Sequence, residues 1–331
     1  MQPETTRQGE KQTGRQGEEE PQGRNPGARS HGLTAEPPSA LEPISQPASW
    51  RQIDWREHQR WVTVQGSPLN VVEVGSGKPV LFVHGLGGNW TNWLEQLPVI
   101  GQRWRAIAPD LPGFGHSPMP TGPISIGGYA SVLKGLLQAL DIDSAAVVGN
   151  SMGGQTAVEL ALSDPPLVDR LLLVSPAGIS TSAVAPRLRM IRLLHPALNT
   201  ANRWIAAHAE AVARRPLLKR LTMSLVAADP QRIPAPLAAE QLTGLGKPGF
   251  LPALEALVAD SAHLQQRLRT ISCPTLILWG ENDPVISVRD AEIFHRCIPG
   301  SRKLVWEQTG HVAMFERAEQ FNELLAGFLS E

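Results

Sequence analysis

Short apolar runs rich in β-branched residues recur along this chain, and Gly, Pro, Asn or Asp residues bound them. Runs of this length and composition predict strands that are buried on both faces. They cover residues 79–83, 145–148, 170–174, 275–279 and 303–306. Patterns with helical spacing separate these runs, for example in residues 129–140. Strands that alternate with helices predict an α/β domain with a mostly parallel sheet.

The remaining expected elements flank these runs. Residues 60–64 and 69–74 are expected to form an antiparallel pair that turns at residues 66–68. Helices are expected over residues 90–100, 155–162 and 315–329. Strand signals stop between Gly178 and about Leu268, where the chain is rich in Ala, Leu and Arg and is interrupted by eight prolines. This composition predicts an insertion of several short helices.

The first 49 residues differ from the rest in composition. They are rich in Gln, Glu, Gly, Arg and Pro, and their first large aliphatic residue is Leu33. Such a segment cannot bury enough apolar surface to offset the entropy of ordering, so we expect disorder. We therefore divide the chain into a disordered extension (1–49), a first core part (50–177), a helical insertion (178–268) and a second core part (269–331). A start codon assigned too early is an alternative explanation of the extension.

Charge and composition narrow the partners and the compartment. The formal net charge of −1 gives no indication of a nucleic-acid partner. The chain has no stretch of eighteen apolar residues, so no transmembrane helix is expected. The extension lacks the apolar region of a secretory signal, and the two cysteines, Cys273 and Cys297, are too few for a disulfide framework. We expect a cytoplasmic protein, and its oligomeric state stays open.

The helical insertion is basic, although the whole chain is nearly neutral. Residues 178–268 contain eleven Lys and Arg residues and five Asp and Glu residues. A solvated charged face is the default interpretation of such a segment. The alternatives are a rim that attracts anionic ligands and a weak contact with a lipid surface.

A serine between glycines marks the end of one predicted strand. Residues 149–153 read Gly-Asn-Ser-Met-Gly, between the apolar run 145–148 and a helical pattern. This arrangement is typical of a nucleophile elbow, in which a tight turn holds the serine hydroxyl above the sheet. Gly149 and Gly153 would remove the side chains that collide in such a turn. On its own the motif is weak, because serine and glycine are common.

Three more segments with candidate chemistry follow predicted strands. Residues 84–88 read His-Gly-Leu-Gly-Gly, Asp283 follows the run 275–279, and His311 follows the run 303–306. The carboxyl ends of parallel strands meet at one edge of a sheet, where ligands bind in open α/β folds. Glu281 is a rival to Asp283, but Asp283 precedes a proline that would stiffen the loop. The chain order serine, acid, histidine is that of the α/β-hydrolases.

These motifs together resemble the α/β-hydrolase fold serine hydrolases with a helical cap, over about residues 60–331. The Gly-Asn-Ser-Met-Gly-Gly wording is similar to the branch of esterases and meta-cleavage-product hydrolases, which break carbon–carbon bonds. The resemblance implies a doubly wound, mostly parallel sheet of about eight strands, with the cap inserted after the sixth. It also implies site roles, which are a catalytic triad of Ser151, Asp283 and His311, oxyanion-hole amides at Leu86 and Met152, and structural loop residues at His84, Gly85, Gly149 and Gly153.

The expected reaction is hydrolysis of carboxylic esters through an acyl-enzyme. We expect an apolar substrate-binding wall that contains Trp90, Trp204, Ile286 and Val312, and hence a small hydrophobic ester or ketone substrate. No metal site is expected, because the chain has neither H-E-x-x-H nor zinc-type Cys/His spacing. No cofactor is expected either, because no G-x-G-x-x-G follows a strand.

Two alternatives stay open. Carbon–carbon bond hydrolysis is suggested by Asn150 and by the double glycine after Met152. Two departures count against it, because that branch usually carries tryptophan where Val312 stands and an arginine in a region that matches residues 240–245, which contain none. The other alternative is a ligand receptor on the same scaffold, which would show single or very slow turnovers.

Overall fold

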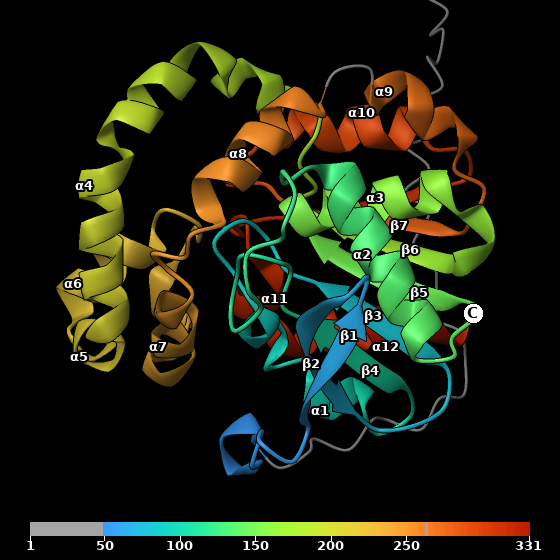
Figure 1. The fold of residues 1–331 in the computed structure, drawn as a ribbon, viewed down its shortest axis with the longest axis horizontal. Coiled ribbons are helices and arrows are strands. Elements are labelled where there is room, and N and C mark those ends of the chain that lie inside the picture. The colour runs from blue at the N-terminus through green and yellow to red at the C-terminus, as the bar shows by residue number, and fades with distance from the viewer. Residues whose placement is uncertain (1–48, 262–263) are drawn as a thin grey trace, which may run out of the picture. The chain divides into compact units, whose positions relative to one another are not determined.

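The computed structural model describes residues 49–261 and 264–331, and a mixed sheet of eight strands runs through them (Figure 1). The strand order is β1-β2-β4-β3-β5-β6-β7-β8. Only the pairs β1–β2 and β2–β4 are antiparallel, so the expected mostly parallel sheet of about eight strands is confirmed. The strands are β1 Gln59–Val64, β2 Ser67–Val74, β3 Pro79–Val83, β4 Arg105–Pro109, β5 Ala145–Asn150, β6 Val168–Val174, β7 Thr275–Gly280 and β8 Arg302–Trp306. The expectation for residues 1–49 falls, apart from Ser49, outside the described residues.

Helices cover both faces of the sheet, as a doubly wound fold requires. One face packs against α2 (Ile126–Ala139), α3 (Met152–Ser163) and α10 (Arg289–Cys297). The other face packs against η2 (Trp90–Trp93), α1 (Leu97–Ile100), α11 (Ala313–Glu316) and α12 (Ala318–Ser330). Two further short helices add to these layers: Leu167 of η3 (Pro165–Leu167) is buried with the first, and Trp50 of η1 (Trp50–Gln52) packs against the second. Strands β5 and β7 are buried along their whole length, which explains their continuous apolar runs.

Between β6 and β7 the chain forms a series of helices rather than strands (Figure 1). They are η4 Ser180–Arg187, α4 Leu188–Ala207, α5 Ala209–Arg214, α6 Pro216–Met223, η5 Pro230–Arg232, α7 Ala235–Thr243, α8 Phe250–Ala259, α9 Leu264–Arg267 and η6 Leu268–Thr270. Prolines lie in the first turns of α6, η5 and α7, where a missing N–H costs no intrahelical hydrogen bond. We refer to residues 178–268 as the cap segment.

Three local expectations were wrong. The hairpin turns at Gln65 and Gly66, both with positive φ, so Ser67 and Pro68 belong to β2. The single helix expected over residues 90–100 is divided into η2 and α1, because the Asn89 side chain caps η2 and Pro98 opens a new helix. The C-terminal helix is interrupted at Arg317, whose φ of −140° is not helical.

The aromatic side chains of β3, η2 and α12 form a continuous stack beneath the sheet. Trp93 lies between Phe82 and Phe321, with ring centroids 5.1 and 6.4 Å away, and all three side chains are fully buried. The stack therefore joins the C-terminal helix to the central strand that precedes residues 84–88.

We predict that Phe321→Ala destabilises the protein by about 3–5 kcal/mol, because it leaves a cavity in this stack. Urea unfolding followed by circular dichroism measures the change. Trp61→Ala is the matched control, because Trp61 is an exposed aromatic residue on the edge strand β1, and its loss should cost less than about 1 kcal/mol. Equal effects of the two substitutions would contradict the packing described here.

Candidate active site

Ser151 occupies a strained turn between β5 and α3. Its backbone has φ 56° and ψ −118°, a conformation that L-residues rarely adopt. Hydrogen bonds to both the amide and the carbonyl of Ser151 hold this turn. The Ser151 amide donates to the Val174 carbonyl at 3.0 Å, and its carbonyl accepts from the amides of Gln155 and Ala177 at 3.1 and 2.9 Å. The strain at Ser151 is therefore held by β6 and by the first turn of α3.

The glycines around Ser151 are required by close backbone contacts. A Cβ atom on Gly149 would lie 2.4 Å from the Gly153 carbonyl oxygen, and one on Gly153 would lie 2.1 Å from the Val83 carbonyl oxygen. Neither contact can relax, because the contacted atoms are main-chain oxygens, one in the first turn of α3 and one in strand β3. The positions that the sequence predicts as structural glycines thus bring β3, β5 and α3 to van der Waals distance.

Asp283 and His311 form a buried hydrogen-bonded pair. The distance between His311 Nδ1 and Asp283 Oδ2 is 2.8 Å, and both side chains are almost fully excluded from solvent. The other carboxylate oxygen of Asp283 accepts from the amides of Val285 and Ile286 at 2.8 and 2.9 Å. The carboxylate is therefore fixed in orientation, and a proton on His311 Nδ1 leaves Nε2 as the basic nitrogen. The rival acid Glu281 is exposed.

Backbone contacts bring the acid loop and the histidine loop together. A Cβ atom on Gly280, the last residue of β7, would lie 2.1 Å from the Gly310 carbonyl oxygen. Just beyond it, the Asn282 amide donates to the Thr309 carbonyl at 2.9 Å. The loops that follow β7 and β8 can therefore meet only because residue 280 has no side chain.

Asn150 connects the serine turn to the histidine loop. Its Nδ2 atom donates to the Val174 carbonyl at 3.1 Å and to the His311 carbonyl at 3.2 Å. The sequence interpretation treats Asn150 as a marker of one hydrolase branch, and its positioning role was missed. Because Asn150 directly precedes Ser151, this side chain fixes the backbone of the serine turn relative to that of His311.

The loop after β3 lies directly against Ser151. A Cβ atom on Gly85 would lie 3.2 Å from the Ser151 Cβ atom, so the loop passes across the serine side chain. Leu86 follows in this loop, and Met152 is the first residue of α3. A first-turn helix amide has no intrahelical acceptor and is available to a ligand. The Leu86 amide thus belongs to the loop that crosses Ser151, and the Met152 amide belongs to the helix that follows Ser151.

His84 is held as a neutral side chain. Its Nε2 atom accepts from the Leu111 amide at 3.0 Å, which leaves Nδ1 to donate to the Gly85 carbonyl at 2.8 Å. Burial lowers the pKa of the His84 imidazole, although nearby Asp110 acts in the opposite direction. With both ring nitrogens occupied, His84 orders the loop and has no nitrogen left to act as a base.

Asp110 is a second buried group that organises this edge of the sheet. Its carboxylate accepts from the Asn70 side chain at 2.7 Å and from the amides of Trp90 and His116 at 2.8 Å each. The side chain is fully buried. Asp110 therefore fixes the start of η2 and the turn after β4.

The four expected substrate-binding residues lie in different surroundings. Ile286 and Val312 are buried beside Asp283 and His311 in the chain. Trp90 is buried, but its ring packs on Trp55 at 5.1 Å between centroids. Trp204 is 56% exposed on α4, and its ring stacks on His208 at 4.5 Å. The structure therefore does not bring Trp204 into the buried surroundings of the other three.

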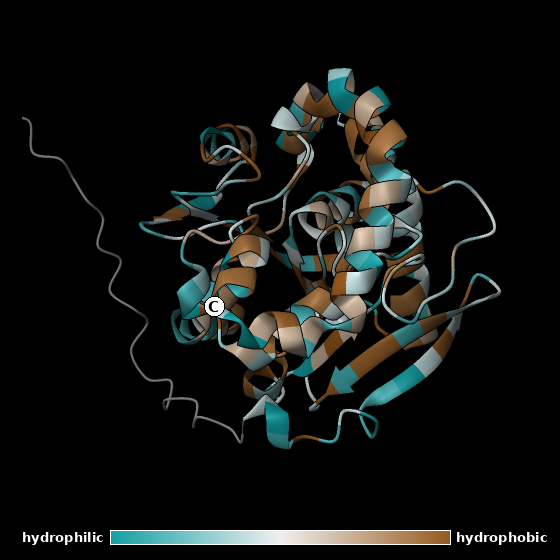
Figure 2. Ribbon diagram, turned by 90° about the vertical axis from the view of Figure 1, so that its left-hand side faces the viewer, coloured by the Kyte–Doolittle hydropathy of each residue, from teal (hydrophilic) through white to brown (hydrophobic). Residues whose placement is uncertain are grey.

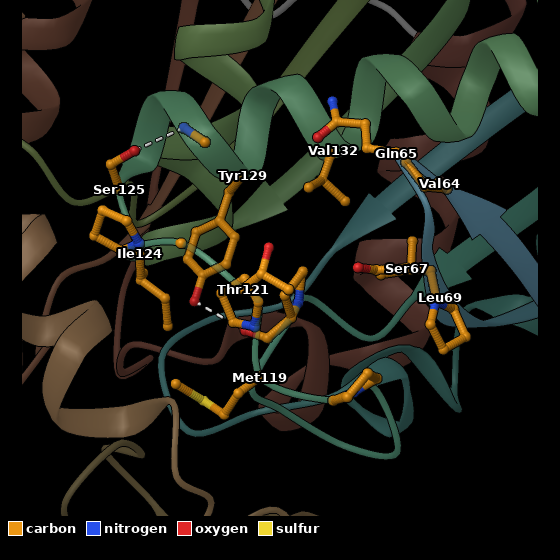
Figure 3. Close-up of a pocket in the computed structure, with 17 residues that line it drawn as sticks. Val64, Gln65, Ser67, Leu69, Met119, Thr121, Ile124, Ser125, Tyr129 and Val132 are labelled. Carbon is orange, nitrogen blue, oxygen red and sulfur yellow. Dashed lines mark hydrogen bonds between the residues drawn. The ribbon is translucent and has the colours of Figure 1, made fainter.

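A cavity of about 210 Å³ lies between the β1–β2 hairpin, α2 and the loop 118–125 (Figure 3), and none of the four expected substrate-binding residues lines it. Tyr129 points into this region and donates to the Pro112 carbonyl at 3.2 Å. None of the residues predicted for catalysis lines the cavity, and its lining includes no His, Asp, Glu or Cys. Because no base accompanies its hydroxyl groups, we do not assign hydrolysis to it.

Within residues 49–261 and 264–331, no three His, Cys, Asp or Glu side chains are arranged to hold a metal ion. Over the same ranges, no helix combines the length and the hydropathy that crossing a membrane requires.

Glu316 is a positioning residue that the sequence interpretation missed. One carboxylate oxygen accepts from the Gly310 amide at 2.7 Å, and the other accepts from the amides of Ala228 and Asp229 at 3.0 Å each. The His311 amide also donates to the Val226 carbonyl at 2.8 Å. The histidine loop is thus bonded to the cap segment. Only the tertiary fold shows this role, since Glu316 follows an ordinary helical pattern.

Burial raises the pKa of the Glu316 carboxyl, while the three amides that donate to it act in the opposite direction. We predict that Glu316→Gln destabilises the protein by about 1–3 kcal/mol, because an amide NH₂ cannot accept from the backbone amides that face it. Urea unfolding measures the loss, and Glu323→Gln, on the exposed side of α12, is the control. An unchanged midpoint for Glu316→Gln would refute the bridge.

Known proteins are similar to this chain in sequence and in fold. The family model described as alpha/beta hydrolase fold matches residues 78–318. An uncharacterised protein of Mycobacterium tuberculosis is 31% identical over 81% of this chain and 80% of its own length. The 2-hydroxy-6-oxo-6-phenylhexa-2,4-dienoate hydrolase of Comamonas testosteroni is 30% identical over 78% of this chain and 90% of its own.

Two solved structures share the fold. Est816, described as an N-acyl homoserine lactone degrading enzyme, has a TM-score of 0.66 and 27% identity, covering 81% of this chain and 100% of its own. A meta-cleavage product hydrolase of Pseudomonas fluorescens has a TM-score of 0.64 and 24% identity, covering 83% of this chain and 98% of its own. This chain belongs to the alpha/beta hydrolase fold family, and it fits the branch of meta-cleavage product hydrolases and esterases.

Proposed function

We propose that this protein is a serine hydrolase that cleaves carboxylic esters of hydrophobic substrates. The observation that carries the proposal is the strained Ser151 turn, bonded through Asn150 to a histidine that is paired with a buried aspartate. A strained backbone persists only where the surroundings hold it, and it is characteristic of functional sites. We assign Ser151 as the nucleophile, His311 as the base and Asp283 as the acid of the triad.

The mechanism follows from the assigned roles. Nε2 of His311 takes the Ser151 hydroxyl proton as the oxygen bonds to the substrate carbonyl carbon, and Asp283 stabilises the imidazolium that forms. The carbonyl oxygen becomes an oxyanion, for which we assign the amides of Leu86 and Met152 as donors. His311 then protonates the departing alcohol, which leaves an acyl group on Ser151. Water, deprotonated by His311, releases the acid and restores the serine.

We assign substrate binding to apolar side chains beside the triad. Ile286 and Val312 are buried next to the two loops that carry Asp283 and His311. A wall of this kind favours a hydrophobic acyl or alcohol group over a charged one. We also propose that residues 178–268 act as the cap over the site, between core parts 50–177 and 269–331. The contacts of Gly310 and His311 with residues 226–229 support this division.

Carbon–carbon bond hydrolysis is the second candidate. The relatives of known activity favour it, since hydrolases of 2-hydroxy-6-oxo-dienoates are 29–30% identical over 78–82% of this chain. The residues favour esters, because residues 240–245 offer no arginine to pair with a substrate carboxylate. Gln241 in this region is instead bonded to Asn92 and to the Thr91 carbonyl.

We predict that Ser151→Ala lowers kcat for p-nitrophenyl esters by about four to six orders of magnitude, because no other nucleophile replaces the hydroxyl. The thermal midpoint should stay that of the wild type. A serine-directed fluorophosphonate should label Ser151 alone, as peptide mass mapping would report. Ser163→Ala, at the far end of α3, is the control and should be labelled normally. Label on another residue, or turnover retained in Ser151→Ala, would refute the assignment.

We predict that kcat/KM is higher for p-nitrophenyl esters of hydrophobic acids than for a 2-hydroxy-6-oxo-dienoate. A missing charged contact to the dienoate carboxylate costs about 1.5–3 kcal/mol, or about 10–100-fold. Steady-state kinetics on both substrates, with Ser151→Ala as the blank, decide the matter. A higher value for the dienoate would make carbon–carbon cleavage the activity. A stoichiometric burst without turnover on either substrate would favour a receptor.

A further inference from the structure

The outward face of α4 is apolar. None of the twenty residues of this helix is buried. Its exposed large apolar side chains are Met190, Leu193, Leu194, Leu198 and Trp204, and Leu193 is 79% exposed. At 100° per residue these positions fall within one stripe of the helix. Each of the five side chains is at least 48% exposed, and Trp204 stacks on His208 at the end of the same helix.

The opposite side of α4 is the one that faces the protein. Half-buried positions recur at Ile191, His195, Asn199 and Asn202, which lie three or four residues apart. The His195 ring stacks on Phe250 of α8, with 6.4 Å between centroids. A surface helix usually turns its apolar side to the core and its polar side to water. In α4, His195, Asn199 and Asn202 lie on the inward side, whereas the arginines and most of the bulky apolar residues are exposed.

A second apolar stripe lies on the neighbouring helix α6 and its end. Leu217, Leu221 and Leu225 are spaced by four residues, and each is more than half exposed. Helix α5 contacts both α4 and α6, and all three lie on one side of the described body (Figure 1). Figure 2 is viewed from that side and shows apolar and polar residues interleaved on the helices there.

Basic residues accompany the two stripes. Residues 187–225 contain eight Lys and Arg residues and one acidic residue, Glu210. Arg189, Arg192 and Arg203 fall on one flank of the α4 stripe. Arg192 pairs with Glu255, and Arg214 pairs with Glu210. The segment therefore keeps a strong positive charge next to exposed leucines and a tryptophan, although the chain as a whole is at −1.

We propose that α4 and α6 dock on an anionic lipid surface, with their apolar stripes in the headgroup region and their arginines on the lipid phosphates. Interfacial helices combine these features, which are an apolar face with Leu and Trp and a polar face rich in Arg. Anionic lipid attracts each nearby Lys or Arg by about 1 kcal/mol. The proposal does not depend on the reaction that the protein catalyses.

Two other occupants of the stripes, a second copy of this chain and residues 1–48, fit less well than an anionic lipid surface. A second copy of the chain would bring two basic segments together, and like charges repel across an interface. Residues 1–48 carry seven acidic and five basic residues but only four large apolar ones, namely Met1, Leu33, Leu41 and Ile44. That segment offers little apolar surface to cover the eight exposed side chains of the two stripes.

The test is co-sedimentation of the full chain with vesicles, in a Ser151→Ala background so that no lipid is hydrolysed. Vesicles of phosphatidylglycerol and phosphatidylcholine in equal parts are compared with pure phosphatidylcholine. We expect binding to the anionic vesicles, weakened by salt. Vesicles with brominated acyl chains should quench tryptophan fluorescence, and Trp204→Phe should remove most of the quenching.

Substitutions of leucine and of arginine separate the apolar from the electrostatic contribution to vesicle binding. Leu193→Ser and Leu217→Ser should each lower the partition coefficient about ten-fold, because an apolar side chain is lost from the interface. Arg189→Gln and Arg220→Gln should each lower it about five-fold. Trp61→Ser is the matched control, because Trp61 is as exposed as Trp204 but lies on β1, and it should bind like the parent.

Four results would overturn the proposal. The first is no binding to anionic vesicles, and the second is binding that Leu193→Ser and Arg189→Gln leave unchanged. The third is a dimer in sedimentation equilibrium that Leu193→Ser dissociates, which would assign the stripes to a second copy. The fourth is vesicle binding only after deletion of residues 1–45, which would assign them to the chain's own N-terminal segment.

Discussion

The candidate site depends on the close approach of main-chain segments at the carboxyl edge of the sheet. Ser151 can adopt its left-handed conformation only because β3, β5, β6 and α3 meet around it, and they can meet only where glycine stands. The same constraint recurs at Gly280, which lets the acid and histidine loops touch. Residues without side chains therefore set the positions of the three side chains to which we assign chemistry.

The second constraint is the bond between the histidine loop and the cap segment. Glu316 and the His311 amide together make three hydrogen bonds that join residues 310–316 to residues 226–229, and Glu316 also accepts from the Gly310 amide within the histidine loop. A displacement of this part of the cap would carry the histidine loop with it. The exposed stripes on α4 and α6 lie in the same cap segment, so a surface that binds these helices acts on an element continuous with the site.

Most of the core fold could be predicted from the sequence. Strands that are buried on both faces appear as continuous apolar runs, and glycine residues mark the tight turns. The order of Ser151, Asp283 and His311 then places all three at one sheet edge. What the sequence could not show depends on tertiary contacts. Glu316 follows an ordinary helical pattern, the division of residues 90–100 depends on the Asn89 cap, and the outward apolar face of α4 has the same periodicity as an inward one.

The central claim is that Ser151, His311 and the amides of Leu86 and Met152 act on one carbonyl group. A crystal structure of the protein inhibited by a p-nitrophenyl alkylphosphonate tests it most directly, because the tetrahedral adduct resembles the acylation intermediate. We expect a phosphorus–oxygen bond to Ser151, with the phosphonyl oxygen about 2.7–3.1 Å from both amides and His311 Nε2 facing the ester oxygen. An adduct on another residue, or a phosphonyl oxygen turned away from both amides, would contradict it.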